Sequence, residues 1–305
     1  MNGTSFALIT LGANSFSLMI AASHPHEPSV QKAYKRKVRL LEHISADGQL
    51  HDASIQRAQE CLSFFYDCLK QHQIDAQHVH IFATAPLREM SQPQYFHQMA
   101  RDSIPYPIQV LSPEQECHFI YQGTRITTEL QDPCLIIDIG GGSTEIILGQ
   151  QQRILAQCSI PLGCLNVQSY FLKERLKEHD ISRVQQEVNH HLALHLSALQ
   201  QCIPHSTVGT SGIIQALTEL PNRAHQEPVI TRKWIKLLLE QNIGRTITAP
   251  NLVGLKESRK PTFIAGLLIL NALFEALNLE HIRRAHGALR EGLLHYAYTH
   301  TTPPV

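Results

Sequence analysis

The chain of 305 residues contains 26 Lys and Arg, 26 Asp and Glu, and 43% hydrophobic residues, so its formal net charge is zero and its pI is near 7.3. This length accommodates two domains with apolar cores, and the balanced charge excludes bulk electrostatic capture of nucleic acid or of a membrane surface. The seven cysteines include no Cys-x-x-Cys pair, which favours reduced thiols in a cytoplasmic protein over disulfides or a zinc site.

Neither a membrane span nor a histidine metal site is expected. The apolar segment 6–22 lacks the basic region that begins a signal peptide, and no run is long and apolar enough for a transmembrane helix. His191 and His195 have the spacing of one helix face, but no His-Glu-x-x-His motif accompanies them, and zinc normally needs three or four ligands. A solvated helix face is the simpler interpretation.

The first part of the chain predicts strands that alternate with helices. Runs of apolar and β-branched residues predict strands, and apolar residues spaced by three and four predict helices. Strands are expected at 6–11, 16–22, 33–41, 79–83 and 108–111, and helices at 52–69 and 94–100. Ser112, Pro113 and Gln115 then form an N-cap and capping-box pattern, which predicts a helix that continues to Gly123.

A polar stretch at 124–133 is expected to contain a linker, after which the order of elements begins again. Strands are expected at 135–138, 146–148, 154–159 and 207–208, and helices at 165–171, 181–199, 213–220, 232–241, 262–277 and 289–298. The chain is therefore expected to contain two α/β halves.

The most informative segment is Asp138 to Glu145, with the sequence Asp-Ile-Gly-Gly-Gly-Ser-Thr-Glu between two apolar runs. Two β-branched runs joined by glycines predict a hairpin, and successive glycines let backbone N–H groups converge on an anion. The segment lacks the Gly-Lys-Ser/Thr of a P-loop, and a strand follows it where a dinucleotide fingerprint has a helix. We interpret it as a phosphate loop with an acid at each end. A plain glycine-rich turn is the alternative.

A second copy of this loop supports the interpretation. The segment Leu11 to Ser15 aligns with Ile139 to Ser143, and Ala83-Thr84-Ala85 aligns with Gly209-Thr210-Ser211 at nearly the same distance. A duplicated unit fixes architecture, and two βββαβα-like halves that each carry a phosphate hairpin are the plan of actin-like folds. We therefore predict an α/β fold of two actin-like, ribonuclease H-like domains with a central inter-domain cleft.

The joint order of the motifs resembles the exopolyphosphatase/guanosine pentaphosphate phosphohydrolase family. The matching stretches are 11–16, 37–40, 83–89, 111–112 with Glu116, 138–145, 161–163, 208–212, 230–232 and 289–292. The resemblance implies a short member with domains at 1–126 and 127–305, and without the additional helical domain of the long members. It also implies a hydrolase that removes a terminal phosphoryl group from polyphosphate or guanosine pentaphosphate with Mg²⁺ or Mn²⁺, and family members often form homodimers.

The site residues follow from the resemblance position by position. Glu116 falls where the family has its general base, and Arg88 where it has an arginine that clamps phosphate. Asp138 and Glu145 match acids that help to hold the metal ion. The loop residues expected to bind phosphate are Gly12, Ala13, Asn14 and Ser15 in the first half, and Gly140, Gly141, Gly142, Ser143 and Thr144 in the second. By position alone, Glu116 would be an ordinary acid at a helix start and Arg88 a surface ion-pair residue.

Departures from the family pattern leave more than one function open. Thr10 stands where the first motif has Asp, opposite Asp138 in the second half, and Ser17 stands where the family has Arg or His. The loss of one carboxylate weakens a site for Mg²⁺, which demands near-octahedral oxygen geometry. The first hypothesis is a phosphohydrolase, and the second is a degenerate member that binds polyphosphate or a nucleotide without turnover. A third is an actin-like ATPase or kinase with an adenosine pocket at 209–212.

Overall fold

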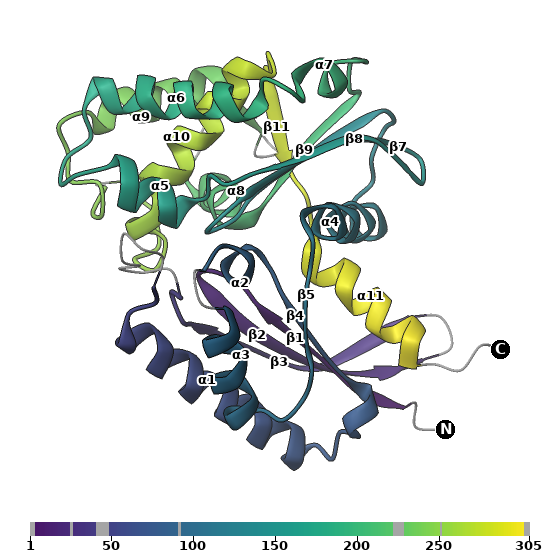
Figure 1. Ribbon diagram of the computed structural model, residues 1–305. Coiled ribbons are helices and arrows are strands. Elements are labelled where there is room, and N and C mark those ends of the chain that lie inside the picture. The colour runs from purple at the N-terminus through teal and green to yellow at the C-terminus, as the bar shows by residue number, and fades with distance from the viewer. Residues whose placement is uncertain are drawn as a thin grey trace. The chain divides into compact units, whose positions relative to one another are not determined.

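The computed structural model of the chain describes residues 4–24, 27–40, 49–90, 93–221, 229–250 and 252–301. The chain forms two compact units, each with its own sheet (Figure 1). The first unit comprises Met1–Phe119 and Leu289–Val305, and the second comprises Ile120–Ala288. The last helix of the chain therefore belongs to the same unit as the first strands.

A five-stranded sheet in the order β3-β2-β1-β4-β5 forms the centre of the first unit. Its strands are β1 (Ser5–Leu11), β2 (Ser15–Ser23), β3 (Pro28–Lys37), β4 (Val79–Ala83) and β5 (Ile108–Val110). The first three strands form an antiparallel meander, and β4 and β5 continue the sheet parallel to β1. The connections contain α1 (Asp52–Gln71), the 3₁₀ helix η1 (Ala76–His78), α2 (Ala85–Glu89) and α3 (Pro93–Ser103).

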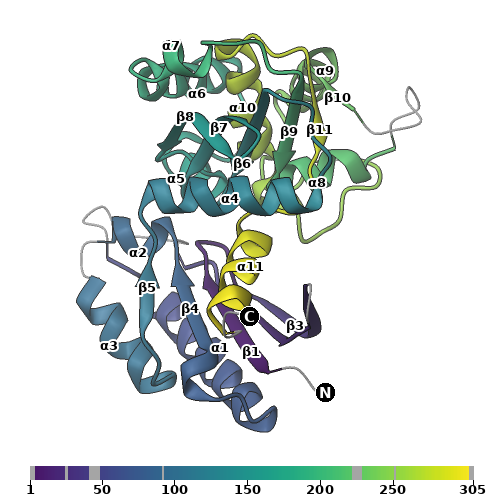
Figure 2. The same ribbon diagram turned by 90° about the vertical axis from the view of Figure 1, so that its right-hand side faces the viewer.

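Both faces of this sheet are apolar, because successive side chains of a strand point to opposite faces. On one face, Ile9 of β1 lies in a buried cluster with Phe65 of α1. On the other face, Leu8 of β1 lies in a second cluster with Leu293 of α11 (Leu289–Thr301). Figure 2 shows α11 lying along the β1 side of this unit. The C-terminal helix is therefore part of the core of the first unit.

The second unit contains a six-stranded sheet in the order β10-β11-β9-β6-β7-β8. Its strands are β6 (Cys134–Ile139), β7 (Thr144–Gln150), β8 (Arg153–Ile160), β9 (Ser206–Thr210), β10 (Ile230–Thr231) and β11 (His281–Arg284). The helices are α4 (Pro113–Thr127), which begins in the first unit, α5 (Cys164–Phe171), α6 (Glu178–Leu192), α7 (Leu196–Leu199), α8 (Ser211–Glu219), α9 (Arg232–Asn242) and α10 (Lys260–Ala276). The antiparallel meander followed by a parallel strand repeats the plan of the first unit.

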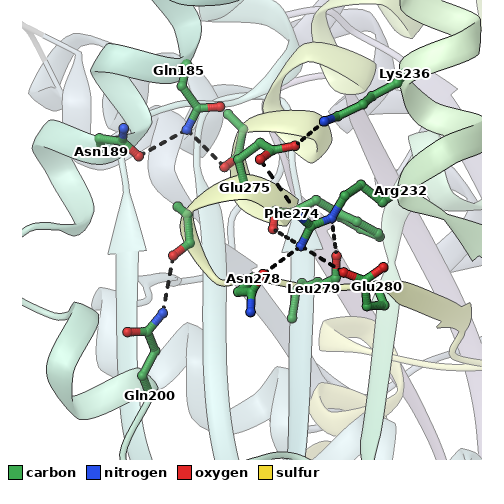
Figure 3. A network of polar contacts seen from close by, with 12 residues as sticks. Gln185, Asn189, Gln200, Arg232, Lys236, Phe274, Glu275, Asn278, Leu279 and Glu280 are labelled. Carbon is green, nitrogen blue, oxygen red and sulfur yellow. Dashed lines mark hydrogen bonds and ion pairs between the residues drawn. The ribbon is translucent and has the colours of Figure 1, made fainter.

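Arg232 closes the C-terminal end of the buried helix α10 (Figure 3). Its Nη2 donates to the Phe274 carbonyl at 3.4 Å and to Asn278 Oδ1 at 3.0 Å. Its Nε donates to the Leu279 carbonyl at 2.8 Å. The last carbonyls of a helix lack intrahelical partners, and a cation there also offsets the negative end of the helix dipole. Arg232 therefore has a structural role, joining the start of α9 to the end of α10.

The structure differs from the predicted elements at several places. β3 begins at Pro28 rather than at residue 33, and residue 41 of that predicted strand lies outside the described residues. The predicted helix 181–199 is two helices, α6 and α7, and the predicted linker at 124–133 begins with the last turn of α4. The strands β10 and β11 were not predicted, since strands of two and four residues are too short to show an alternating pattern.

No helix in the described part of the chain is both long enough and apolar enough to cross a lipid bilayer. The most continuously buried one, α10, is 17 residues long, and its side chains belong to the core of the second unit.

Replacing Leu293 by Ala should destabilise the first unit. Leu293 is fully buried in the cluster that joins α11 to β1, and removing a buried Leu side chain typically costs about 2–5 kcal/mol. Urea unfolding followed by circular dichroism should show a lower midpoint. The matched control is Arg290→Ala on the same helix, whose side chain pairs with the neighbouring Glu291, and which should cost less than about 1 kcal/mol. Equal midpoints for Leu293→Ala and the unmodified chain would contradict the packing of α11.

Candidate active site

The two glycine loops are hairpins with the same closing hydrogen bond. In the first, between β1 and β2, Gly12 N–H donates to the Ser15 carbonyl at 3.2 Å. In the second, between β6 and β7, Gly140 N–H donates to the Ser143 carbonyl at 2.9 Å. A Cβ atom on Gly12 would lie 3.2 Å from the Ser15 oxygen, and one on Gly140 would lie 3.0 Å from the Ser143 oxygen. The repeat seen in the sequence therefore corresponds to a repeated loop geometry.

Residues 38–40, which follow β3, hold the carbonyl oxygens of the first loop. Leu40 N–H donates to the Ala13 carbonyl at 2.7 Å, and the N–H groups of residues 38 and 39 donate to the Asn14 carbonyl at 3.1 and 3.0 Å. The carbonyl and N–H groups of one peptide unit point in opposite directions because the unit is planar and trans. The N–H groups of Asn14 and Ser15 therefore point away from residues 38–40.

The first turn of α5 holds the second loop in the same way. The hydrogen bonds join Cys164 N–H to the Gly140 carbonyl (3.0 Å), Leu165 N–H to the Gly141 carbonyl (2.8 Å), and Asn166 Nδ2 to the Gly142 carbonyl (2.7 Å). Three successive carbonyls are thus directed at α5, and the N–H groups of Gly141, Gly142 and Ser143 point away from it. Successive N–H groups on one side of a loop form a concavity that binds anions.

Gly163 allows α5 to approach the second loop this closely. A Cβ atom at Gly163 would lie 2.4 Å from the backbone of Gly141, which is closer than real Cβ atoms come to other heavy atoms. Gly163 N–H also donates to Asn166 Oδ1 at 2.6 Å, which orients the amide that binds the loop. Thr144, predicted as a phosphate ligand, donates its hydroxyl proton to the Leu162 carbonyl at 2.6 Å. The loop and the start of α5 therefore form one connected structure.

Asp138 and Glu145 lie directly opposite each other on β6 and β7, on one face of the sheet. Glu145 is buried, and Ser159 Oγ on β8 donates to its Oε1 at 2.8 Å. On the other side of Asp138, Thr210 of β9 lies in register with it. The Thr210 hydroxyl oxygen is buried and has no hydrogen-bond partner among the described residues. Oxygen-bearing side chains therefore form a row across the strands beside the second loop.

This row suits a hard divalent cation. Mg²⁺ prefers oxygen ligands and is usually held by one or two carboxylates together with substrate phosphates and water. In the part of the chain that the structure describes, no three or more His, Cys, Asp or Glu side chains gather as a complete metal site. Asp138 and Glu145 could hold such an ion together with oxygens of a bound phosphate, and the buried Thr210 hydroxyl is a further oxygen, without another partner in the part of the chain that the structure describes.

The corresponding positions beside the first loop are neutral. Thr10 and Ser17 lie opposite each other on β1 and β2, as Asp138 and Glu145 do on β6 and β7. The hydroxyl oxygens of Thr10 and Ser17 are 2.6 Å apart and share a hydrogen bond. The hydroxyl groups of these two side chains are hydrogen-bonded to each other, and neither carries a negative charge that could bind a metal ion.

Arg88 and Glu116, both predicted as catalytic residues, form an ion pair in the first unit. Arg88 Nη1 lies 2.9 Å from Glu116 Oε2, and the same nitrogen donates to the Leu111 carbonyl at 2.6 Å. The Glu116 residue is 5% exposed, and a charge this buried is stable only when it is paired. The guanidinium of Arg88 supplies this pairing.

The predicted capping box at the start of α4 is confirmed and fixes the position of Glu116. Ser112 Oγ accepts from Gln115 N–H at 3.2 Å, and Gln115 Oε1 accepts from Ser112 N–H at 2.9 Å. The reciprocal bonds satisfy N–H groups that the first helical turn leaves without partners. Glu116 therefore lies in the first turn of a well-defined helix.

The cysteines near the second loop are unsuited to nucleophilic chemistry. Burial raises the pKa of the Cys158 thiol to about 12, with a smaller contribution from the Glu145 charge. Burial likewise raises the pKa of the Cys164 thiol to about 12, although a backbone hydrogen bond opposes the change. All seven cysteines are free, as predicted. At neutral pH these two thiols remain protonated, and the protonated form is a poor nucleophile.

Four residues beside the second loop and its acids were not predicted as site residues: Ser159, Gly163, Asn166 and Thr210. Gly163 and Thr210 lie within stretches that match the family, so a signal for them was present. Ser159 and Asn166 have no local signal, because their contacts depend on the pairing of β7 with β8 and on the approach of α5. Of the predicted residues, the structure joins Arg88 to Glu116 and places Asp138 beside Glu145.

Both units place an antiparallel hairpin with a glycine loop beside parallel strands, and this topology is that of an actin-like α/β protein. It confirms the predicted fold class. The model of the Ppx/GppA phosphatase family matches residues 19–299. The chain therefore belongs to the Ppx/GppA phosphatase family.

Relatives with curated names agree with this membership. The chain is 34% identical over 298 residues to a protein of Pseudoalteromonas translucida named guanosine-5'-triphosphate,3'-diphosphate pyrophosphatase. It is 33% identical over 294 residues to a protein of the same name from Vibrio vulnificus. The alignments cover 95% and 96% of this chain but 58% and 59% of the relatives. The chain thus spans less than two thirds of the length of these relatives.

Solved structures share the fold at low sequence identity. An exopolyphosphatase from Cytophaga hutchinsonii has a TM-score of 0.83 and 20% identity, over 97% of this chain and 98% of that chain. The Aquifex aeolicus member of the Ppx/GppA family has a TM-score of 0.76 and 20% identity, over 99% of both chains. These structures are similar in architecture to the chain over nearly its whole length.

Replacing Gly163 by Ala should loosen the second loop. The added methyl group must push α5 away from Gly141, so the hydrogen bonds to the loop carbonyls should weaken, at a cost of about 1–3 kcal/mol. Hydrogen exchange of the amides of Cys164 and Leu165 should become faster. Asn166→Ala removes the side-chain hydrogen bonds to the Gly142 carbonyl, the Pro161 carbonyl and Gly163 N–H, but it leaves the close approach of α5 to Gly141 in place, so it should have a smaller effect on these amides. Unchanged exchange in Gly163→Ala would contradict the close contact.

Proposed function

We propose that the chain is a phosphohydrolase that releases terminal phosphate from inorganic polyphosphate, from guanosine pentaphosphate, or from both. The observation that carries the proposal is the second loop, in which three backbone N–H groups point away from α5 and the flanking acids Asp138 and Glu145 lie side by side. Such a loop binds a phosphate group, and such acids bind the cation that accompanies it. The name of the curated relatives supports guanosine pentaphosphate as one substrate.

Glu116 is proposed as the general base and Arg88 as the residue that orients it and binds phosphate. The support is the ion pair between them, in which a buried carboxylate lies 2.9 Å from the guanidinium. Arg88 is also fixed by the Leu111 carbonyl, so its guanidinium has a defined direction. Phosphoryl transfer depends mainly on positioning and on charge neutralisation, and a fixed guanidinium contributes to both.

Asp138 and Glu145 are proposed to hold Mg²⁺ or Mn²⁺. The support is the chemistry of the row, since carboxylate and hydroxyl oxygens on one sheet face are ligands of hard cations. A bound divalent ion would neutralise charge on the phosphate oxygens. Ser159 keeps one Glu145 oxygen in place through its hydrogen bond.

The reaction proposed for these groups is attack of water on the terminal phosphorus. The water oxygen forms a bond to phosphorus, the anhydride P–O bond breaks, and the shortened phosphate chain leaves with the electron pair. Glu116 takes the proton of the attacking water. The loop N–H groups of Gly141, Gly142 and Ser143 hold phosphate oxygens throughout, because they are preorganised by the contacts of the loop carbonyls with α5.

The alternative is a member that binds polyphosphate or a nucleotide without efficient turnover. The observation that favours it is the neutral pair Thr10 and Ser17 in place of a carboxylate. Both the hydrolase and the binding-only member require the loops to bind phosphate, so a measurement of binding does not distinguish the two functions. Release of inorganic phosphate does.

Replacing Glu116 by Gln should lower the rate of phosphate release from long-chain polyphosphate or guanosine pentaphosphate by about 10²- to 10⁴-fold, which is the usual contribution of a general base. Gln keeps the size of the side chain but accepts a proton poorly. The rate is measured as free phosphate with Mg²⁺ or Mn²⁺ present. The matched control is Glu114→Gln, two residues away on an exposed position of the same helix, which should change the rate by less than about twofold.

Two results would contradict the proposal: one would exclude Glu116 as the base, and the other would exclude hydrolysis altogether. Equal rates for Glu116→Gln and the unmodified chain would remove Glu116 as the base. No release by the unmodified chain from either substrate, with tight binding retained, would leave the binding-only alternative. Circular dichroism of Glu116→Gln separates a chemical defect from loss of folding, since the ion pair with Arg88 also stabilises the first unit.

A further inference from the structure

The third strand of the first sheet extends the row of Thr10 and Ser17 by a lysine. Ser17 of β2 lies in register with Lys35 of β3, and Ser15 at the end of the first loop lies in register with Lys37. Residues in register on neighbouring strands project from the same face, with Cβ atoms about 4.5–5.5 Å apart. Lys35 and Lys37 therefore lie on the face that carries the Thr10 and Ser17 hydroxyl groups.

The neighbouring residues of β3 support this alternation. Tyr34 and Arg36 project from the opposite face, toward Phe64 of α1. The Tyr34 ring lies 5.5 Å from the Phe64 ring in an edge contact, and the Arg36 guanidinium lies 3.6 Å from the centroid of the same ring. Arg36 is thus engaged in a cation–π contact. Among the basic residues of β3, Lys35 and Lys37 are the exposed ones on the sheet face that carries Thr10 and Ser17.

The two sheets therefore carry opposite charge beside loops of the same geometry. In the second sheet the hairpin positions carry the carboxylates of Asp138 and Glu145. In the first sheet the same positions carry the neutral Thr10 and Ser17, and the next strand adds the Lys35 ammonium. Carboxylates reach a phosphate group through a cation between them, whereas an ammonium group binds phosphate directly.

Backbone contacts connect the strand that carries the lysines to the first loop. Residues 38–40 continue directly from β3 and donate to the carbonyls of Ala13 and Asn14. The same contacts turn the N–H groups of Asn14 and Ser15 away from residues 38–40. The backbone of the strand that carries Lys35 and Lys37 is therefore connected to the first loop by hydrogen bonds from the residues that follow the strand.

We propose that Lys35 and Lys37, together with the N–H groups of Asn14 and Ser15, form a phosphate-binding subsite that works without a metal ion. Its ligand is a chain of phosphate groups, as in an inorganic polyphosphate or a nucleoside polyphosphate. The subsite deepens the proposed function and rests on it for the identity of the ligand. It assigns to the first unit a direct ammonium–phosphate contact in place of a carboxylate–metal contact.

Titration calorimetry with linear tripolyphosphate in the presence of EDTA tests the proposal. The Lys35→Ala/Lys37→Ala variant should bind tripolyphosphate at least about tenfold more weakly than the unmodified chain, since each contact is a charge-assisted hydrogen bond. Lys35→Arg should retain most of the affinity, because it keeps the charge. The matched control is Lys32→Ala on the same strand, paired with Ile20 of the α1-facing cluster, and it should leave the affinity within about twofold.

The outcomes separate the subsite from the proposed function. Equal affinity of the double variant and the unmodified chain would overturn the subsite, as would binding that appears only when Mg²⁺ is added. Phosphate release with an unchanged KM in the double variant would keep the hydrolase and reject the subsite. Weakened binding in the double variant, with no phosphate release by the unmodified chain, would keep the subsite and reject the hydrolase.

Discussion

The hydrogen bonds to the carbonyl oxygens of the two glycine loops are the interaction on which the candidate site depends. In the second loop, the first turn of α5 supplies the donors, at distances of 2.7–3.0 Å. The first N–H groups of a helix lack intrahelical partners, and the loop carbonyls satisfy them. Once the carbonyls are fixed, planarity of the peptide unit fixes the opposite direction of the N–H groups. Gly163 makes this possible, because it leaves no Cβ atom between α5 and Gly141.

The two units use the same loop geometry with different side chains beside it. Asp138 and Glu145 give the second sheet negative charge, and they suit a hard cation shared with phosphate oxygens. Thr10 and Ser17 give the first sheet a self-satisfied neutral pair, next to the ammonium of Lys35. The repeated loop geometry is therefore the same in both units, while the side chains beside it are acidic in the second sheet and neutral or basic in the first.

The sequence predicted the parts of this account that are encoded locally. The hairpins, their repeat and the capping box before Glu116 follow from residue type and spacing, and the structure contains them. The partners of distant segments were not predictable, because an apolar helix pattern does not say which sheet the helix will cover. The packing of α11 on β1, the pairing of Arg88 with Glu116 and the role of Arg232 at the end of α10 all depend on such long-range placement. The run at 35–39 showed basic charge, but only strand register separates Lys35 from its neighbour on the opposite face.

The most direct test of the central claim is the response of the loop amides to a phosphate ligand. Amide chemical shifts of the ¹⁵N-labelled chain are compared before and after addition of tripolyphosphate, with and without Mg²⁺. The account predicts the largest shifts at Gly141, Gly142 and Ser143, and at Asn14 and Ser15, with small shifts at Cys164 and Leu165, whose N–H groups are bound to loop carbonyls. Shifts of the α5 amides without shifts of the loop amides would contradict it.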